Sequence, residues 1–509
     1  MSEIDLETIS ALSTRLGLDI SEADLACYQS LLGDVQSAVA DFEKLPQRPA
    51  VVSPAVRDPG HVPTFEEDPL NAVIRRISIK REGARGKLSG RRIGLKDTIA
   101  VAGVPMTAAS RLLEDYIPAQ DAVVVDRLLD EGAELVAKLN MDGFAWSGSA
   151  DTGDYGPILN PVDRARSASG SSGGSAAALY YDWVDMTLGA DQAGSIRMPA
   201  SWCGVLGLKP THGLIPYTGV MSVDPTIDHV GPLTRTVADM ALMLDVLAGA
   251  DPSDPRQIGN PGPEQYSYEV ENASSDLKGV RIGLLREGFG TAVGVIPEVA
   301  RAVRETATRF EALGAELVEV SIPEHLHGGL FAFAFYCEAQ LHAFESGGNG
   351  YGWNGTYTPD LAQALGNAFR NGAARMPATL KTVLLAGEML RNRYNGALYA
   401  RAQNLRPWLR MAYDRGLDGL DALILPTTPM PARVHTSEGD LAERVRRGWS
   451  TLPNTPTADV TGHPAISIPA AQVEGMPQGV MLIGKHFRDA NLLRLARAYE
   501  QEYGWFPEV

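Results

Sequence analysis

From about Asn71 onward, short apolar runs alternate with longer amphipathic segments, and this alternation limits the fold more than any other feature of the chain. Strands that alternate with helices build a buried sheet with helices on both faces. The sequence therefore predicts an α/β fold. We expect strands at residues 92–95, 134–139, 185–189, 280–285, 421–425 and 479–483, and helices at residues 121–131, 237–247, 298–313 and 491–500.

The first 70 residues have a different pattern, typical of an α-helical region. Residues 21–24 (Ser-Glu-Ala-Asp) resemble a capping box, and apolar residues then recur every three or four positions up to Phe42. A shorter helix precedes it, and residues 46–69 have the Pro-rich composition of a linker or strap. We therefore divide the chain into residues 1–70 and 71–509. The apolar stripe needs a partner, either the main domain or a second subunit.

Charge and cysteine content exclude several classes of function. The 509-residue chain has a formal net charge of −17, so nucleic acid and anionic membranes are unfavourable partners. The apolar run near residues 330–337 is far too short to span a bilayer, and the N-terminus lacks an apolar targeting core. The three cysteines show neither metal-ligand spacing nor a disulfide framework. These features predict a soluble cytoplasmic protein.

Two glycine-flanked serines, Ser171 and Ser195, carry the strongest chemical signal. A serine hydroxyl is a poor nucleophile until a base removes its proton, and no histidine lies near either serine in sequence. Lys96 follows an apolar strand, where burial would disfavour its charged form and make it a base. Backbone N–H groups near Gln192, Ala193 and Gly194 could form an oxyanion hole beside Ser195.

Each of these residues also has a purely structural interpretation. Ser195 could cap a glycine-rich turn, and Ser171 or Ser172 could cap a helix over residues 173–181. Lys96 could be a surface lysine at a strand end. Residues 170–174 also match the nucleophile elbow Gly-x-Ser-x-Gly with Ser172 as nucleophile, but polar residues precede them where that motif needs a strand.

Other motifs give weaker signals. His325 and His327 could bind a metal, but two histidines without further spaced ligands are more often surface residues. The glycines at residues 288–290 do not complete a dinucleotide-binding loop. Trp146 and Trp202 could line an aromatic acyl pocket or simply pack in the core. Residues 325–400 could form an insertion that covers the site.

Taken together, these motifs resemble the amidase signature family, whose catalytic group is a serine, a second serine and a lysine. The strongest block spans residues 169–209, and the resemblance covers most of residues 71–500. Within that family, the sequence is most similar to bacterial enantioselective amidases of the Rhodococcus type that act beside nitrile hydratase. Later matching blocks lie at residues 231–236, 402–406, 425–429 and 461–465.

The resemblance implies a fold and a set of roles. The fold is a large mixed central sheet covered by helices, and the reaction is hydrolysis of carboxylic amides to acid and ammonia. Ser195 is the nucleophile of an acyl-enzyme, and Ser171, in a cis peptide bond after Gly170, relays protons between it and Lys96. Further implied residues are Gln192, Ala193, Gly194, Gly170 and Trp146 for oxyanion or substrate binding, and Asp191, Arg197 and Ser172 for support.

The resemblance also implies a homodimer acting on a small amide without metal or organic cofactor. Two residues depart from the family pattern, because Ala193 and Ser169 stand where glycine is usual. Alanine fits only if its φ is negative. The alternatives are a mandelamide-type or other aryl amide or hydrazide hydrolase, and the glutaminase subunit of a tRNA-dependent amidotransferase. The helical N-terminal region and the acidic composition favour a free-standing hydrolase.

Overall fold

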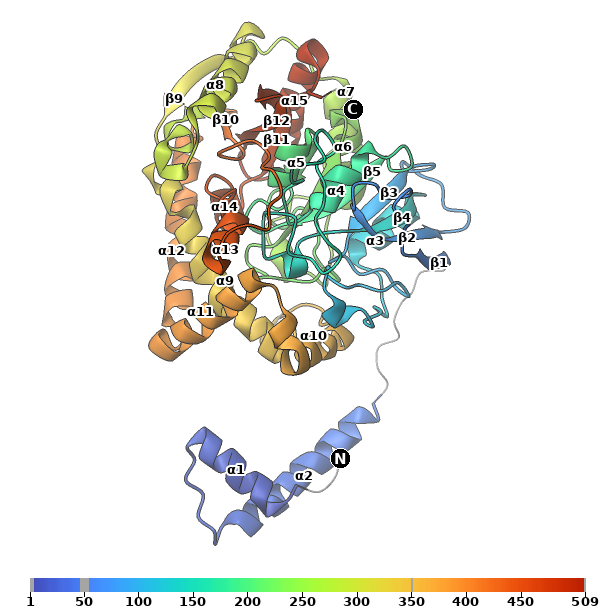
Figure 1. The fold of residues 1–509 in the computed structure, drawn as a ribbon, viewed down its shortest axis with the longest axis vertical. Coiled ribbons are helices and arrows are strands. Elements are labelled where there is room, and N and C mark those ends of the chain that lie inside the picture. Colours follow the sequence, from blue (N-terminus) through green and yellow to red (C-terminus); the bar gives the residue numbers. More distant parts are fainter. Residues whose placement is uncertain (1–3, 46–54, 349–350, 508–509) are drawn as a thin grey trace. The chain divides into compact units, whose positions relative to one another are not determined.

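The computed structural model describes residues 4–45, 55–348 and 351–507 (Figure 1). The chain divides into two compact units, Met1–Val51 and Val52–Val509. This division lies earlier than our expected boundary near residue 70, because strand β1 (Val56–His61) pairs with β2 (Val73–Lys80) in the main sheet. Part of the expected linker is therefore an edge strand, and residues 46–54 lie outside the described residues.

The N-terminal unit consists of helices α1 (Leu6–Leu16) and α2 (Leu25–Glu43). Gln29 of α2 donates a hydrogen bond of 2.9 Å to the carbonyl of Ile4, which ties the two helices together. The expected capping box is wrong: the N-cap residue of α2 is Asp24, and the Ser21 hydroxyl donates to the Asp24 carboxylate instead of capping the helix. The expected apolar stripe is present on α2.

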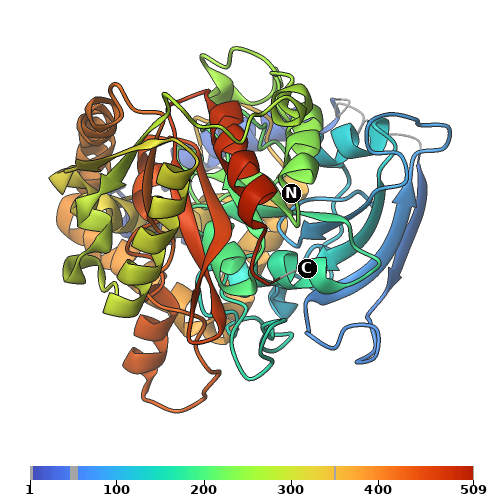
Figure 2. The same cartoon turned by 90° about the horizontal axis from the view of Figure 1, so that it is seen from above.

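The main unit is built on a mixed sheet of twelve strands, in the order β1-β2-β4-β3-β5-β7-β6-β11-β12-β10-β8-β9. Figure 2 shows the N-terminal strands in blue at one end of this sheet and β9 in yellow-green at the other. Parallel pairs join β3 to β4 and β5, and β8 to β9 and β10. The remaining strands are β3 (Arg92–Lys96), β4 (Glu134–Leu139), β5 (Met186–Asp191), β6 (Leu206–Lys209), β7 (His229–Thr234), β8 (Arg281–Leu285), β9 (Glu316–Val320), β10 (Ala422–Pro426), β11 (Ala465–Val473) and β12 (Met476–Ile483).

Helices pack against the sheet and also form a second layer beside it (Figure 1). Side chains of α3, α6, α8 and α15 join the largest core cluster with the strands, while α4 and α5 belong to a separate cluster. Helices α9 to α12 build a third apolar cluster. The helices of the main unit are α3 (Val123–Asp130), α4 (Gly173–Ala177), α5 (Arg197–Cys203), α6 (Val237–Leu247), α7 (Tyr266–Glu271), α8 (Pro297–Ala312), α9 (Gly328–Ser346), α10 (Pro359–Gly372), α11 (Ala378–Tyr394), α12 (Ala397–Gly416), α13 (Leu441–Trp449), α14 (Pro456–Thr461) and α15 (Asp489–Tyr503).

The expected fold class is confirmed, and each expected strand and helix of the main unit is present with its ends shifted by three residues or fewer. We did not predict strands β1, β2, β6, β7, β9 and β11. Strand β7 reads His-Val-Gly-Pro-Leu-Thr, and glycine and proline are depleted in strands. Among the described residues, no helix is long and apolar enough to cross a membrane.

Side-chain alternation along the neighbouring strands β3 and β5 determines which face Lys96 and Asp191 point to. Ile93 and Leu95 of β3 belong to the cluster that contains α3 and α6, as do Leu188 and Ala190 of β5. Successive side chains of a strand point to opposite faces. Lys96 and Asp191, at the carboxyl ends of these strands, therefore point to the other face, toward α4 and α5.

Helix α4 lies unusually close to the strands because of one glycine. A Cβ on Gly174 would overlap the backbone carbonyls of Ala72 and Asn140. The Gly174 N–H donates a 3.0 Å hydrogen bond to the Asn140 carbonyl, and Ser175 of the same helix donates to the Leu188 carbonyl at 3.0 Å. Gly174 thus allows α4 to approach the sheet closely, which places Ser171 and Ser172, just before this helix, next to β5.

We predict that Gly174→Ala lowers the thermal unfolding midpoint, because backbone atoms must move to admit the methyl group. The free energy of unfolding should fall by about 1–3 kcal/mol. Differential scanning calorimetry would measure the change. Gly329→Ala is the matched control, since a Cβ at this helical glycine of α9 meets nothing within 4 Å. A midpoint unchanged by Gly174→Ala would contradict the proposed close approach.

Candidate active site

Lys96 and Ser171 meet in the interior of the main unit. The Lys96 Nζ lies 2.7 Å from the Ser171 Oγ and 3.2 Å from the carbonyl oxygen of Ala190, and both side chains are fully buried. Burial lowers the pKa of Lys96 to about 7, against the opposing effect of nearby carboxylates such as Asp191. The amine is therefore partly neutral near pH 7 and can accept a proton. The alternative interpretation, in which Lys96 is a surface lysine at a strand end, is therefore wrong.

The segment before α4 is shaped around Asp142. The peptide bond between Gly170 and Ser171 is cis, as expected, and a Cβ on Gly170 would overlap the Asp142 carboxylate. That carboxylate accepts hydrogen bonds from the backbone N–H groups of Ala150 and Thr152, and the Asp142 N–H donates to the Ser171 carbonyl at 3.2 Å. Sequence analysis missed Asp142, whose only signal is a carboxylate three residues after a buried strand.

Ser195 lies in the turn between β5 and α5 and lines a cavity. The Ser172 N–H donates a 3.1 Å hydrogen bond to the Ser195 carbonyl, which joins the two serine segments. Within the described residues, no hydrogen bond links the hydroxyls of Ser171 and Ser195. Catalytic hydrogen bonds are often long without substrate and tighten only when it binds.

The backbone around Ser195 presents N–H groups beside the nucleophile. The Gly194 N–H donates to the Asp191 carboxylate, so this expected oxyanion donor is already engaged. The N–H groups of Gln192 and Ala193 have no acceptor among the described residues. Tyr336 donates its hydroxyl proton to the Gln192 carbonyl, and Thr455 donates to the Ala193 carbonyl, which fixes the peptide planes that carry the N–H groups of Ala193 and Gly194.

Of the two departures from the family pattern, Ala193 fits its backbone conformation, whereas Ser169 occupies a conformation that favours glycine. Ala193 does not have a positive φ, whereas Gly194 has a φ of 125°. Alanine therefore replaces glycine at 193 without strain. Ser169 does have a positive φ, of 62°, and its hydroxyl donates to the Gly148 carbonyl at 3.1 Å.

Asp191 and Arg197, both expected to support the site, form a fully buried ion pair. Arg197 reaches both oxygens of Asp191, with Nε 2.9 Å from Oδ2 and Nη2 3.0 Å from Oδ1. Although burial opposes ionisation, the guanidinium keeps the pKa of Asp191 well below its usual range. Asp459 of α14 binds the same guanidinium at 2.6 Å. Sequence analysis missed Asp459, which lies 262 residues from Arg197 in the chain.

The cavity at Ser195 has a volume of about 330 Å³ and mainly apolar walls. Among the described residues that line it, no side chain carries a charge. Trp146 lines it as expected, with its indole N–H donated to Gln340 at 2.7 Å. Helices α9 and α13 supply further walls. Of residues 325–400, which we expected to cover the site, Leu326 and the first part of α9 are the described residues that line the cavity. The apolar side chains include Val223, Leu326, Leu330, Phe333, Tyr336 and Trp449.

Several other candidates lie elsewhere. Trp202 does not line this cavity, because it packs with Ala432 and Met476 in a separate cluster. Ser172 occupies the N-cap position of α4 without a side-chain cap, and its hydroxyl donates to the Ala190 carbonyl at 3.2 Å. The residues just before 170 form two isolated bridges, between Leu159 and Ser167 and between Arg166 and Val434, not the strand that a nucleophile elbow requires.

The two histidines considered as metal ligands, His325 and His327, each contact other side chains. His325 is buried between the Tyr413 hydroxyl and the Asn454 side chain. His327 is exposed, with its ring centroid 6.0 Å from that of Trp408. They form no shared metal site. The glycines at 288–290 belong to a short 3₁₀ turn after β8 rather than to a phosphate-binding loop.

Comparison with known proteins agrees with this geometry. The Amidase family model matches residues 68–493. An enantioselective amidase of Rhodococcus rhodochrous is 39% identical over 454 residues, covering 87% of this chain and 86% of that protein. A glutamyl-tRNA(Gln) amidotransferase subunit of Exiguobacterium sibiricum is 36% identical over 87% of this chain and 90% of its own length.

Solved structures give the same result. The corresponding glutamyl-tRNA(Gln) amidotransferase subunit from Thermotoga maritima aligns with a TM-score of 0.70 at 28% identity, over 86% of this chain and 90% of that one. The native peptide amidase from Stenotrophomonas maltophilia aligns with a TM-score of 0.69 at 28% identity, over 85% and 89%. The chain belongs to the amidase signature family and is an enzyme that hydrolyses amides.

Proposed function

We propose that this chain is a free-standing amidase that hydrolyses carboxamides with apolar acyl groups to the acid and ammonia. The observation that carries this proposal is an uncharged, apolar cavity that opens on Ser195, behind which a buried lysine lies 2.7 Å from a second serine. An apolar pocket with a few convergent polar groups is the usual form of a small-molecule site.

The proposed reaction uses the three residues in sequence. Neutral Lys96 accepts the proton of Ser171 while Ser171 accepts that of Ser195, and the Ser195 oxygen attacks the amide carbon. The N–H groups of Gln192 and Ala193 stabilise the oxyanion. The proton returns through Ser171 to the leaving nitrogen, the C–N bond breaks and ammonia departs. Water then hydrolyses the acyl-enzyme by the same relay.

A glutaminase subunit of an amidotransferase is the second candidate, because relatives named as amidotransferase subunits match at similar coverage. Glutamine carries an ammonium and a carboxylate, and each is costly to bury without a partner. The charge-free lining of the cavity therefore favours an uncharged aliphatic or aryl amide, including mandelamide-type substrates.

We predict that the purified chain alone releases ammonia from benzamide, mandelamide or propionamide with a kcat/KM at least about 100-fold above that for glutamine. Ser195→Ala should lower kcat on the preferred amide by on the order of 10⁴-fold or more. Ser346→Ala is the control, since the hydroxyl of this partly exposed serine of α9 donates to the His342 carbonyl of its own helix. Activity on glutamine alone, or only after a partner protein is added, would favour the second candidate.

We also predict that kcat/KM for propionamide rises about tenfold per pH unit below about pH 7 and levels off above it. The base must be neutral, and the pKa of Lys96 lies at about 7. A pH–rate profile with this non-ionising substrate measures the inflection. In Lys96→Ala the residual rate should show no such inflection. A flat wild-type profile from about pH 5 to about pH 8 would exclude a lysine base.

We further propose a cytoplasmic homodimer. All three cysteines are free, which suits a reducing compartment. On α2 of the N-terminal unit, Tyr28, Val35, Val39 and Phe42 are exposed at the spacing of one helical face. Pairing of this stripe with the same stripe of a second copy would remove it from water.

Light scattering at micromolar concentration should then give the mass of two chains, and Val35→Asp should give the mass of one because a carboxylate would enter the apolar contact. Asp34→Ala serves as the control, being an exposed residue of the same helix outside the stripe. A wild-type chain that remains monomeric would contradict the dimer without affecting the proposed catalysis.

A further inference from the structure

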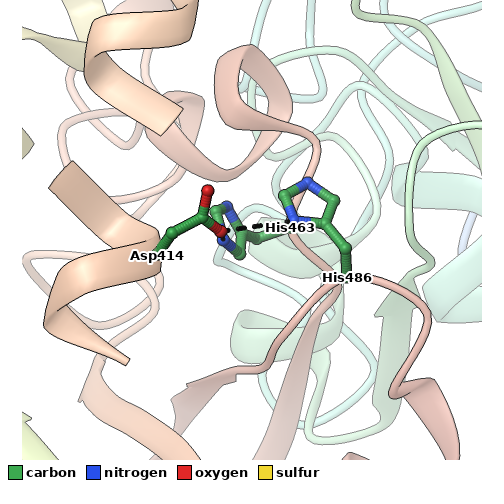
Figure 3. A group of neighbouring side chains, drawn as sticks. All are labelled: Asp414, His463 and His486. Carbon is green, nitrogen blue, oxygen red and sulfur yellow. Dashed lines mark hydrogen bonds and ion pairs between the residues drawn. The ribbon is translucent and has the colours of Figure 1, made fainter. Parts of the chain in front are cut away.

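A cluster of two histidines and one carboxylate lies outside the cavity at Ser195 (Figure 3). Asp414 comes from the C-terminal turns of α12, His463 from the loop between α14 and β11, and His486 from the loop after β12. The nearest ligand-type atoms of the three side chains all lie within 4.8 Å of one another. The reaction described above uses none of them.

Both imidazole rings are oriented by the same residue, Thr461. The His486 Nε2 lies 3.0 Å from the Thr461 carbonyl, which only accepts, so Nε2 carries the proton. The Thr461 hydroxyl donates to the Thr457 carbonyl at 2.8 Å and therefore accepts from the His463 Nδ1, which lies 2.9 Å away. The unprotonated atoms are thus Nε2 of His463 and Nδ1 of His486.

These two lone pairs face the same carboxylate oxygen. The Asp414 Oδ1 lies 3.1 Å from the His463 Nε2 and 3.7 Å from the His486 Nδ1. The hydrogen bonds to Thr461 direct the ring N–H of each histidine away from this oxygen. Three electron-rich atoms therefore face one another without a proton between them, an arrangement that a cation would stabilise.

The cations around the cluster do not fill this position. The Arg410 Nε lies 3.9 Å from the other oxygen of Asp414, Oδ2, which leaves Oδ1 to the histidines. Lys209 acts on His463 electrostatically, but its Nζ donates to the Pro210 carbonyl and contacts His229. These two positive groups weaken cation binding without occupying the space between the three ligand atoms.

We propose that Asp414, His463 and His486 bind a borderline divalent cation, represented by Zn²⁺. With metal–ligand bonds of about 2.0–2.1 Å, ligand atoms of a tetrahedral site lie about 3.4 Å apart, and the two separations from Asp414 Oδ1 bracket that value. Histidines that bind metals usually donate their other N–H to a second-shell acceptor, as both rings do here. The half-exposed Asp414 leaves a fourth position open to solvent.

The chemistry of the ligands selects the metal class. Two imidazoles and one carboxylate suit Zn²⁺ and its first-row neighbours, whereas Mg²⁺ and Ca²⁺ prefer oxygen ligands alone. A bound ion would join α12 to the loops that flank β11 and β12, and would thereby stabilise the folded chain. This inference does not depend on the proposed amide substrate, and its site takes no part in the proton relay.

The test is titration of the tag-free, chelator-treated full-length chain with ZnCl₂ by isothermal titration calorimetry. We expect one saturable site per chain in the micromolar range or tighter, with Zn²⁺ raising the thermal midpoint. Asp414→Asn and His486→Ala should each weaken binding at least about tenfold. Both residues are closer to solvent than His463, and circular dichroism checks that the variants are folded.

His61→Ala is the matched control, because His61 is an exposed histidine 3.1 Å from the Glu67 carboxylate on the surface. It should bind Zn²⁺ like the wild type. Absence of saturable binding to the wild type would overturn the site. Wild-type affinity in both Asp414→Asn and His486→Ala would also overturn it. Neither result bears on amide hydrolysis, which is assayed separately.

Discussion

The candidate site depends on one fully buried guanidinium. Arg197 holds Asp191 with two hydrogen bonds and Asp459 with a third. Asp191 in turn accepts the N–H of Gly194, one residue before Ser195. Removing one partner from such a buried group leaves an uncompensated charge, which costs far more than a surface ion pair contributes. The network therefore fixes the turn at the end of β5 that presents Ser195.

The same burial that makes this network rigid suits Lys96 to its proposed role as a base. Its amine lies in the interior between the Ser171 hydroxyl and the Ala190 carbonyl, with Asp191 and Asp142 acting on it only through space. A direct ion pair would have kept the lysine charged. Arg197 satisfies Asp191 instead, so Arg197 at the start of α5 and Lys96 at the end of β3 have separate roles. One organises the backbone and the other is free to exchange a proton.

The walls of the cavity come largely from a different part of the chain than the three residues proposed for catalysis. Helix α9 and the segment around α13 contribute Phe333 and Trp449, whose rings form a T-shaped contact at 5.3 Å on the cavity wall. Tyr336 of α9 also holds the Gln192 carbonyl. The helical layer therefore shapes the acyl pocket and braces the oxyanion segment at once. Relatives named as amidases and as amidotransferase subunits share the sheet, so this layer is where specificity can differ.

Local patterns in the sequence were enough to predict the fold class, six of the twelve strands and a minority of the helices, because periodicity is recognised over short windows. The three residues proposed for catalysis came from the family resemblance, since each also had a purely structural interpretation. Local patterns did not reveal Asp142 or Asp459, nor that Trp202 lies outside the cavity, since these depend on contacts between segments up to 262 residues apart. Glycine and proline in β7 concealed a strand that neighbouring strands stabilise. The strand before Lys96 led us to expect burial, but the structure was needed to show that this lysine is fully buried and that its pKa falls to about 7, because the pKa depends on the depth of burial.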